Sequence, residues 1–327
     1  MLNMTRAEAA YCWQLFKALR SQLRTDMDFP AIIELQTMNR CNADCPMCPY
    51  PDTIGKQDLC YMSDELFEKI IGQLAGEPAF QSLVLSFQNE PFVDKNLLAR
   101  AKTFKKLLPN KILQVVTNGS LLQKFGIPQV YEYFDLVSIS VSATSKQKYE
   151  QVMKGLSWET VNANLGLIAS KKAWVDKTIL RFIRQEANEQ EASEFKRHWN
   201  KKGFRVFGFE INSRVGLVKD YKQIRVQKGV AGSLRMQVLK FAGKLLIPSC
   251  PIPFISFYIR ADGDAVLCFN DYGEDHIYGN LSGESIRDIF NSPEYRKARN
   301  NSLQENFPDR TLCDKCDLYN EGIWLTI

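Results

Sequence analysis

Strand-like and helix-like segments alternate through most of residues 31–211. The candidate strands are short and rich in Val and Ile, and the segments between them carry apolar side chains at helical spacing. Such alternation predicts a parallel sheet covered by helices, because parallel strands need a crossover between them. Six units fall short of a complete eight-fold barrel, so we expect an open or partial (β/α)6 barrel. The predicted strands are 31–38, 82–87, 112–118, 134–142, 178–183 and 205–211.

The segments before and after this region lack its alternation of strands and helices. Residues 8–24 have the spacing of an amphipathic helix, and 215–249 hold seven Lys and Arg against one acid. From Cys250 onward we expect a β-hairpin turning at Asp262-Gly263, followed by a short helix near 284–292. The predicted parts are a helical extension (1–30), the barrel (31–214), a basic linker (215–249) with a solvated helix inside it, and a small α+β domain (250–327).

Composition points to a cytoplasmic protein. The first thirty residues lack the basic, apolar, small-residue order of a secretory signal, and no run of eighteen apolar residues could span a bilayer. A net charge of +5, from 42 Lys and Arg against 37 Asp and Glu, is too small to indicate nucleic-acid binding. We therefore expect neither a membrane nor a nucleic acid as partner.

Nine cysteines in such a protein indicate metal binding or catalysis, because a reducing compartment disfavours disulfides. Cys12 and Cys60 stand alone and are interpreted as incidental thiols. The other seven form two groups, Cys41, Cys45 and Cys48 near the start and Cys250, Cys268, Cys313 and Cys316 near the end.

The first group lies on the loop after the first predicted strand, where sheet-based α/β proteins build their sites. Thiolates suit iron–sulfur clusters and zinc. A closed zinc site or an electron-transfer cubane takes four protein ligands, so three cysteines leave one coordination position for a substrate. The alternative is that Cys60 is a fourth ligand of a structural zinc, although the Cys-x3-Cys-x2-Cys order is tighter than common zinc spacings.

In this order and place the three cysteines resemble the radical S-adenosylmethionine superfamily, and the resemblance covers most of the chain. It implies a partial six-unit barrel and a 4Fe-4S cluster on Cys41, Cys45 and Cys48. S-adenosylmethionine would chelate the open iron and be cleaved to a 5′-deoxyadenosyl radical, which abstracts a hydrogen atom from the substrate. The cluster would need a reductant such as flavodoxin or ferredoxin.

Further motifs of that family fall at successive strand ends. Gln88-Asn89-Glu90-Pro91 stands where members usually show Gly-Gly-Glu-Pro, which implies that Glu90 and the backbone beside it bind the amino group of S-adenosylmethionine. Met47 occupies a position that is usually aromatic and near the adenine, and Tyr50 could substitute for it. The cofactor-binding residues implied by the resemblance are Met47, Tyr50, Asn89, Glu90, Asn118 and Ser140.

The second group offers four thiolates, which fit a closed site, and its residues alone leave zinc and a cubane open. Twelve residues separate Cys250 from Gly263 and four separate Gly263 from Cys268, a spacing similar to the SPASM and shorter twitch domains of the superfamily. No cysteine follows Cys316, so the resemblance implies one auxiliary 4Fe-4S cluster and two clusters in all.

A fully ligated auxiliary cluster suits electron acceptance, which favours net oxidation of the substrate. The proton released in that step needs a base, and Asp271 and Tyr272 are candidates, with Glu274 and His276 beyond them.

The leading hypothesis for the substrate is a ribosomally made peptide, which the basic stretch 215–249 or a separate leader-recognition protein would receive. The alternative is dehydrogenation or epimerisation of a sugar or aminocyclitol natural product. A third hypothesis, from another class, is a non-catalytic metal-cluster-binding protein.

Overall fold

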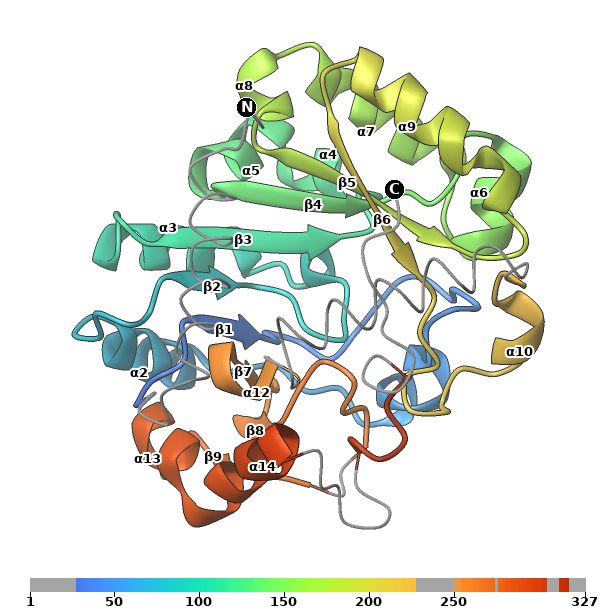
Figure 1. Cartoon of the computed structure of the whole chain (residues 1–327). Helices are drawn as coiled ribbons and strands as arrows, with labels where there is room; N and C mark the ends of the chain where they lie inside the picture. The colour runs from blue at the N-terminus through green and yellow to red at the C-terminus, as the bar shows by residue number, and fades with distance from the viewer. Residues whose placement is uncertain (1–27, 228–249, 251, 274–275, 305–311, 318–327) are drawn as a thin grey trace.

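The structure is a computed structural model that describes residues 28–227, 250, 252–273, 276–304 and 312–317. The described residues form one nine-stranded sheet in the order β6-β5-β4-β3-β2-β1-β7-β8-β9 (Figure 1). Strands β1 to β6 are parallel neighbours, which confirms the predicted fold class. The strands are β1 Ile32–Leu35, β2 Ser82–Val84, β3 Ile112–Thr117, β4 Leu136–Ser140, β5 Thr178–Arg184, β6 Arg205–Glu210, β7 Ser256–Ile259, β8 Asp264–Val266 and β9 Gly279–Asn280.

Helices follow each of the first five parallel strands and cover one face of the sheet. Their apolar side chains join the outward side chains of the strands in one large core, in which Phe104 of α3 (Leu97–Leu107) and Phe195 of α9 (Ala192–Lys201) are fully buried. Helix α2 (Asp64–Leu74) begins after Ser63, whose hydroxyl caps it by accepting a hydrogen bond from Leu66 N at 3.1 Å. The helices of the barrel are α2 Asp64–Leu74, α3 Leu97–Leu107, α4 Leu122–Phe125, α5 Ile127–Tyr133, α6 Lys146–Val152, α7 Trp158–Ala169, α8 Lys172–Val175, α9 Ala192–Lys201 and, after β6, α10 Tyr221–Ile224.

The opposite face of the sheet, here called the inner face, is more open. In β3, Leu113 and Val115 are fully buried against the helices, whereas Gln114 and Val116 between them keep partial exposure. Side chains of a strand alternate between the two faces, so Gln114 and Val116 line the inner face. The same alternation continues through β5, where Leu180 is buried and its neighbours are partly exposed.

The C-terminal segment continues the sheet instead of standing apart from it. β7 pairs parallel with β1, and β8 pairs antiparallel with β7. Gly263 lies in the turn between β7 and β8 with φ +91°, which confirms the hairpin expected there. Helices α12 Ile252–Ile255, α13 Ile286–Asn291 and α14 Pro293–Gln304 pack around it, as the orange and red elements of Figure 1 show. The sequence analysis had not anticipated α14.

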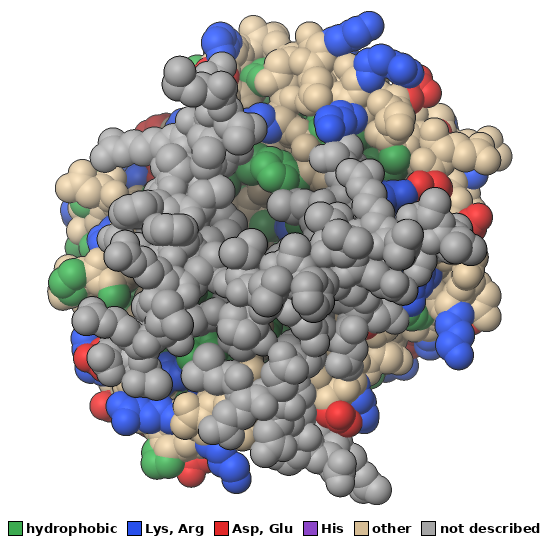
Figure 2. All heavy atoms as spheres, viewed as in Figure 1, with side chains coloured by type: hydrophobic (Ala, Val, Ile, Leu, Met, Phe, Trp, Pro, Cys, Tyr) green, Lys and Arg blue, Asp and Glu red, His purple; other side chains and the backbone are tan. Residues whose placement is uncertain are grey.

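Several expectations fall outside the described residues, namely the helix over 8–24, Cys12, most of the basic stretch 215–249, and Glu274. On the face seen in Figure 2, Lys and Arg side chains lie around the rim with Asp and Glu side chains among them. Within the described ranges, no helix is both long and apolar enough to cross a bilayer.

Candidate functional site

The three early cysteines lie together on the loop that leaves β1. Cys45 is buried, and Cys41 and Cys48 are half-buried. Burial is the largest cause that raises the pKa of Cys41, to about 12, and the charges of Glu90 and Cys48 raise it further. Burial likewise raises the pKa of Cys45 well above its usual range, with Cys48 and Cys41 the next causes. Thiols that influence one another in this way are neighbours, and a positively charged iron centre would stabilise their thiolates.

A cubane and a single metal ion place different demands on the three thiols. Among the described residues, no three His, Cys, Asp or Glu side chains converge closely enough to hold one metal ion. In a cubane each cysteine binds a different iron, so its sulfur atoms lie farther apart than the ligands of a single ion. The donor type of these residues suits an iron–sulfur cluster, and their role as its ligands stays a prediction.

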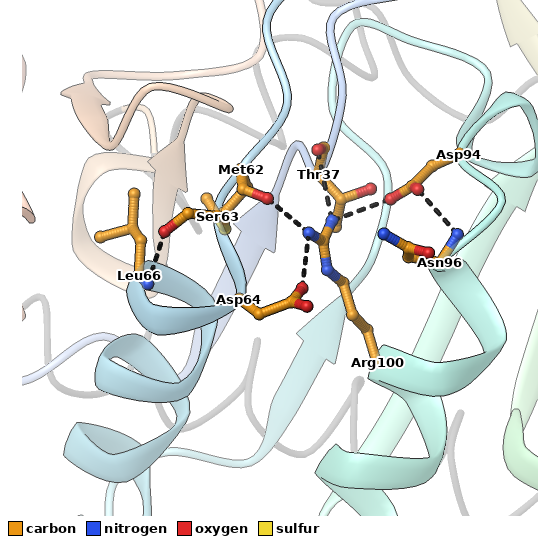
Figure 3. Close-up of polar contacts among 8 residues, drawn as sticks. All are labelled: Thr37, Met62, Ser63, Asp64, Leu66, Asp94, Asn96 and Arg100. Carbon is orange, nitrogen blue, oxygen red and sulfur yellow. Dashed lines mark hydrogen bonds and ion pairs between the residues drawn. The ribbon is translucent and has the colours of Figure 1, made fainter.

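A buried arginine braces both ends of the segment that carries the three cysteines (Figure 3). Arg100 of α3 pairs with Asp94 at 2.8 Å, and the two side chains are only 4% and 1% exposed. The guanidinium also donates to the carbonyl oxygens of Thr37, where the chain leaves β1, and Met62, where it enters α2. Sequence reasoning had not singled out Arg100, because nothing in an amphipathic helix marks one basic residue as buried.

Tyr50 and Met47 are both buried next to the cysteines. The Tyr50 hydroxyl accepts a hydrogen bond from Cys41 N at 2.9 Å. Burial raises the pKa of Tyr50. Met47 joins the main hydrophobic core. Tyr50 therefore supports the cysteine loop directly, and the adenine-binding role of either residue stays a prediction.

The Glu90 carboxylate is buried and already bonded within the protein. One oxygen accepts from Thr117 Oγ1 at 2.6 Å and from Phe92 N at 3.2 Å, and the other accepts from Asn118 N at 2.7 Å. Burial raises the pKa of Glu90 to about 7, and these hydrogen bonds oppose the rise. Its carboxylate links the ends of β2 and β3, and the expected binding of the amino group of S-adenosylmethionine by Glu90 and the neighbouring backbone stays a prediction.

The other predicted cofactor residues lie at the same edge of the sheet. Asn89 Nδ2 donates to Met38 O at 2.7 Å, and Asn118 Nδ2 donates to Asn42 Oδ1 at 2.8 Å, so both brace the cysteine loop. Ser140 ends β4 and is partly exposed on the inner face. Their contacts with S-adenosylmethionine remain predictions.

Gln88 occupies a position of the Gly-Gly-Glu-Pro motif that is usually glycine. It adopts φ 54°, in the left-handed region that glycine favours. Its side chain is held in return, because Nε2 donates to Asp271 O at 2.7 Å. A hydrogen bond to the C-terminal segment thus accompanies the unusual backbone path.

The four late cysteines are also neighbours, each half-buried. Burial raises the pKa of Cys250 and of Cys313 to about 12. Burial also raises the pKa of Cys268 well above its usual range, and the charges of the other three cysteines raise it further. Asn270 Nδ2 lies 3.7 Å from Cys316 Sγ as a hydrogen-bond donor. This set fits a closed, four-cysteine site.

Residues 269–272 lie between the two cysteine groups. The Tyr272 hydroxyl is 3.9 Å from Cys48 Sγ, whereas Asn270 contacts Cys316. Arg214 Nη1 donates to Asn270 Oδ1 at 2.9 Å, which ties the end of β6 to the same segment. The segment directly after Cys268 therefore reaches from the second group to the first.

The candidate bases lie in three different surroundings. The Asp271 carboxylate is buried 3.9 Å from the Arg260 guanidinium. Tyr272 is buried against Tyr50 and Ile54. His276 is exposed. Their catalytic role stays a prediction. Another acid, Glu34, is partly exposed on the inner face, and its charge inside the apolar run 31–35 is a sequence signal that could have indicated it.

Two family models match the chain. That of the radical SAM superfamily matches residues 35–194, and that of an iron–sulfur cluster-binding domain matches 250–317. The chain belongs to the radical SAM superfamily. Its members use S-adenosylmethionine and iron–sulfur clusters, and the cysteine groups fall inside the two matched regions.

Relatives with known structures or names share the fold at low identity. The S-adenosyl-L-methionine-dependent 2-deoxy-scyllo-inosamine dehydrogenase of Niallia circulans is 19% identical over 289 residues, which cover 88% of this chain and 92% of that protein. BtrN in complex with AdoMet and 2-DOIA matches with a TM-score of 0.58 and 16% identity, over 88% of this chain and 93% of BtrN. Streptococcus suis SuiB bound to the precursor peptide SuiA matches with a TM-score of 0.66 and 14% identity, over 98% of this chain and 76% of SuiB.

Proposed function

We propose that this radical SAM enzyme oxidises a C–H bond of a small polar substrate by two electrons and uses one auxiliary cluster as the electron acceptor. The observation that carries the proposal is the 269–272 segment, which touches Cys48 at one end and Cys316 at the other. A radical formed near the first group would therefore lie close to an acceptor held by the second. An electron acceptor beside the radical favours net oxidation.

Cys41, Cys45 and Cys48 would hold the cluster at which bound S-adenosylmethionine supplies a 5′-deoxyadenosyl radical. The substrate loses a hydrogen atom, which ends in 5′-deoxyadenosine. It then loses a proton to a base and an electron to the group held by Cys250, Cys268, Cys313 and Cys316. A low-potential reductant such as flavodoxin or ferredoxin would provide the electron that starts each turnover.

Two observations support a small substrate over a ribosomally made peptide, which was the leading hypothesis from the sequence. The Niallia circulans dehydrogenase, named for an aminocyclitol, matches this chain over almost its whole length. The inner face of the sheet also carries the partly exposed polar side chains of Glu34, Gln114 and Ser140, which suit a polar molecule. Peptide modification is the second candidate, supported by the similarity to SuiB over 98% of this chain, and it would need a separate leader-recognition protein.

The test is a set of alanine variants studied after anaerobic reconstitution. Wild-type protein is expected to bind about eight irons per chain, four for each cubane, and to release 5′-deoxyadenosine with dithionite. Replacing Cys41, Cys45 or Cys48 should abolish that release. Replacing Cys313 or Cys316 should remove about four irons, spare part of the cleavage and stop product formation.

Cys60→Ala is the matched control, because Cys60 belongs to neither group and should leave iron and cleavage unchanged. About four irons with no cleavage in the wild-type protein would refute the two-cluster enzyme. Equal loss of cleavage from both groups of variants would show that the auxiliary cysteines act through folding.

A further inference from the structure

Asn270 is a buried polar residue that contacts two of the four late cysteines. It follows Cys268 by two positions, and its backbone N–H donates to Cys268 Sγ at 3.4 Å. Its side-chain Nδ2 donates to Cys316 Sγ at 3.7 Å. The residue is only 1% exposed, so both hydrogen bonds are shielded from water. One residue therefore directs two N–H groups at the sulfur atoms of the four-cysteine site.

The side-chain amide of Asn270 is oriented by a residue of the barrel. Arg214, just after β6, donates from Nη1 to Asn270 Oδ1 at 2.9 Å. Because the guanidinium holds the oxygen of the amide, the Nδ2 end is turned toward Cys316. A cationic donor on the oxygen also draws electron density out of the amide, which makes its N–H groups stronger donors. Arg214 thus acts on the cysteine site through Asn270.

Arg214 is itself held in place by further contacts. Its Cζ lies 5.2 Å from the ring centroid of Phe269, the residue before Asn270, and its backbone N–H donates to Asn212 Oδ1. Arg214 and Val215 are consecutive residues with φ of 52° and 55°, in the left-handed region that non-glycine residues rarely occupy. Such a backbone is costly and persists only where the surrounding contacts hold it, as they do here.

A second contact joins the end of β6 to the other side of the cysteine site. Ser213 N donates to Asp317 Oδ2 at 2.6 Å, and Asp317 directly follows Cys316. Both residues are buried. The loop after β6 therefore holds the segment after Cys268 and the residue after Cys316 at the same time, which fixes the donor Asn270 relative to its sulfur acceptor.

Hydrogen bonds to cysteine sulfur change the electron affinity of an iron–sulfur cluster. Reduction adds negative charge, part of which falls on the ligand sulfur atoms, so an N–H donor stabilises the reduced state more than the oxidised state and raises the potential. The same preference for negative charge is visible on the thiol, because the hydrogen bond from Asn270 N opposes the rise that burial causes in the pKa of Cys268. Donors at two ligands therefore favour a cluster that accepts an electron.

We infer that Asn270, oriented by Arg214, raises the reduction potential of the auxiliary cluster and so suits it to accept the electron of the substrate radical. Asn270 touches the ligands of the cluster and not the reacting atoms, so it tunes the acceptor without taking part in the chemistry. The inference rests on the proposed function and names the residues that adjust its electron acceptor.

The test is a redox titration of the cluster-loaded protein, followed by electron paramagnetic resonance. S-adenosylmethionine is added to a parallel sample, because it binds only a cluster with an open iron, and the signal that it leaves unchanged belongs to the auxiliary cluster. Asn270→Leu keeps the approximate size of the side chain and removes its donor. The midpoint potential of the auxiliary cluster should fall by an amount equal to about a tenfold change in the reduction equilibrium, or about 59 mV for one electron. The potential of the N-terminal cluster should stay the same.

Asn270→Asp provides a second variant, which does not depend on the folding of Asn270→Leu. Its carboxylate can still accept the hydrogen bond from Arg214, so the segment stays anchored, but it offers no side-chain donor to Cys316. The auxiliary potential should fall at least as far as in Asn270→Leu, because a negative charge replaces the donor. The control Asn200→Leu, at an exposed position of α9, should leave both potentials unchanged.

Arg214→Met tests whether the guanidinium acts through Asn270. On its own it should lower the auxiliary potential, because the amide loses the group that orients and polarises it. Added to Asn270→Leu, it should lower the potential by less than it does alone, since the amide is already gone. A full additional fall in the double variant would mean that the charge of Arg214 acts on the cluster directly, and it would overturn the positioning role of Arg214.

An unchanged auxiliary potential in both Asn270 variants at wild-type iron content would overturn the inference, as would an equal fall in the potentials of both clusters. Loss of about four irons from both variants would also overturn it, because Asn270 would then serve the assembly of the cluster. The release of 5′-deoxyadenosine by wild-type protein, measured alongside, separates this inference from the proposed function. If release occurs and the potential does not shift, the inference fails and the enzyme activity stands. If the potential shifts and release is absent, the tuning by Asn270 stands and the proposed reaction fails.

Discussion

The ion pair between Arg100 and Asp94 allows a quantitative test of how the cysteine loop is braced. Asp94→Asn keeps the shape of the side chain and removes its charge, which leaves the Arg100 guanidinium buried with one partner fewer. The pair is 2.8 Å long and its side chains are 4% and 1% exposed. Breaking a buried pair from one side costs about 3–5 kcal/mol, so we expect the free energy of unfolding to fall by that amount.

Arg100 supplies its own control, because it contacts a second aspartate in a different environment. Asp64 lies 3.1 Å from the same guanidinium, but its side chain is 73% exposed. An exposed pair contributes at most about 1 kcal/mol. Asp64→Asn should therefore change the free energy of unfolding by no more than this, although the two pairs have similar lengths.

The assay is urea unfolding under anaerobic conditions, followed by far-ultraviolet circular dichroism, with wild-type and variant proteins loaded with clusters to the same iron content. The double variant Asp94→Asn/Arg100→Met should lose less than the sum of the two single losses, since no unpaired charge stays buried. Similar small losses for Asp94→Asn and Asp64→Asn would refute the reasoning, as would strict additivity in the double variant.

Three further predictions concern other parts of the site. Burial raises the pKa of Glu34 from 4.5 to about 7, so the native protein binds this proton more tightly than the unfolded protein, and stability should fall as pH rises across that interval. Glu34→Gln should remove up to about 3 kcal/mol of that fall, measured by urea titration at pH 5 and pH 8. An unchanged dependence of stability on pH in Glu34→Gln would contradict the raised pKa of Glu34. Tyr272→Phe removes the hydroxyl 3.9 Å from Cys48 Sγ and should lower the midpoint potential of the N-terminal cluster in an electron paramagnetic resonance titration, whereas the exposed Tyr61→Phe should not. Gly119→Ala would place a Cβ 2.7 Å from Ile139 Cγ2 at φ +78°, so we expect the free energy of unfolding to fall by about 1–3 kcal/mol. The control Gly166→Ala, in open space on α7, should be neutral or slightly stabilising. A tolerated Gly119→Ala would mean that the turn after β3 can shift.

The order of elements was largely predictable from the sequence because it depends on local patterns. Apolar alternation and helical spacing located all six parallel strands of the barrel, and the spacing of cysteines from Cys41 to Cys48 and from Cys250 to Cys316 indicated both groups. Such signals survive in one dimension, because a strand, a helix cap or a cysteine loop is encoded by residues close in sequence.

The sequence could not predict which distant residues meet. The pairing of β7 with β1 places Tyr258 beside Glu34, and no local pattern relates these two residues. In the same way, Cys48 and its neighbour Tyr272 are separated by 224 positions in the sequence. Likewise, Arg100 is an ordinary basic residue of a helix until packing surrounds it with Asp94 and two carbonyl groups.

The sequence by itself determined the kind of cluster that this protein suits, since three cysteines on one loop fit a cluster with an open iron. This ligand set is local in the sequence and does not depend on the rest of the fold. Only the tertiary structure decided what surrounds that chemistry. It placed the segment after Cys268 against Cys48, and it paired β7 with β1 so that Tyr258 lies beside Glu34. The physical reason is that ligand type is a property of individual residues, whereas desolvation, charge pairing and substrate fit depend on neighbours that only folding brings together.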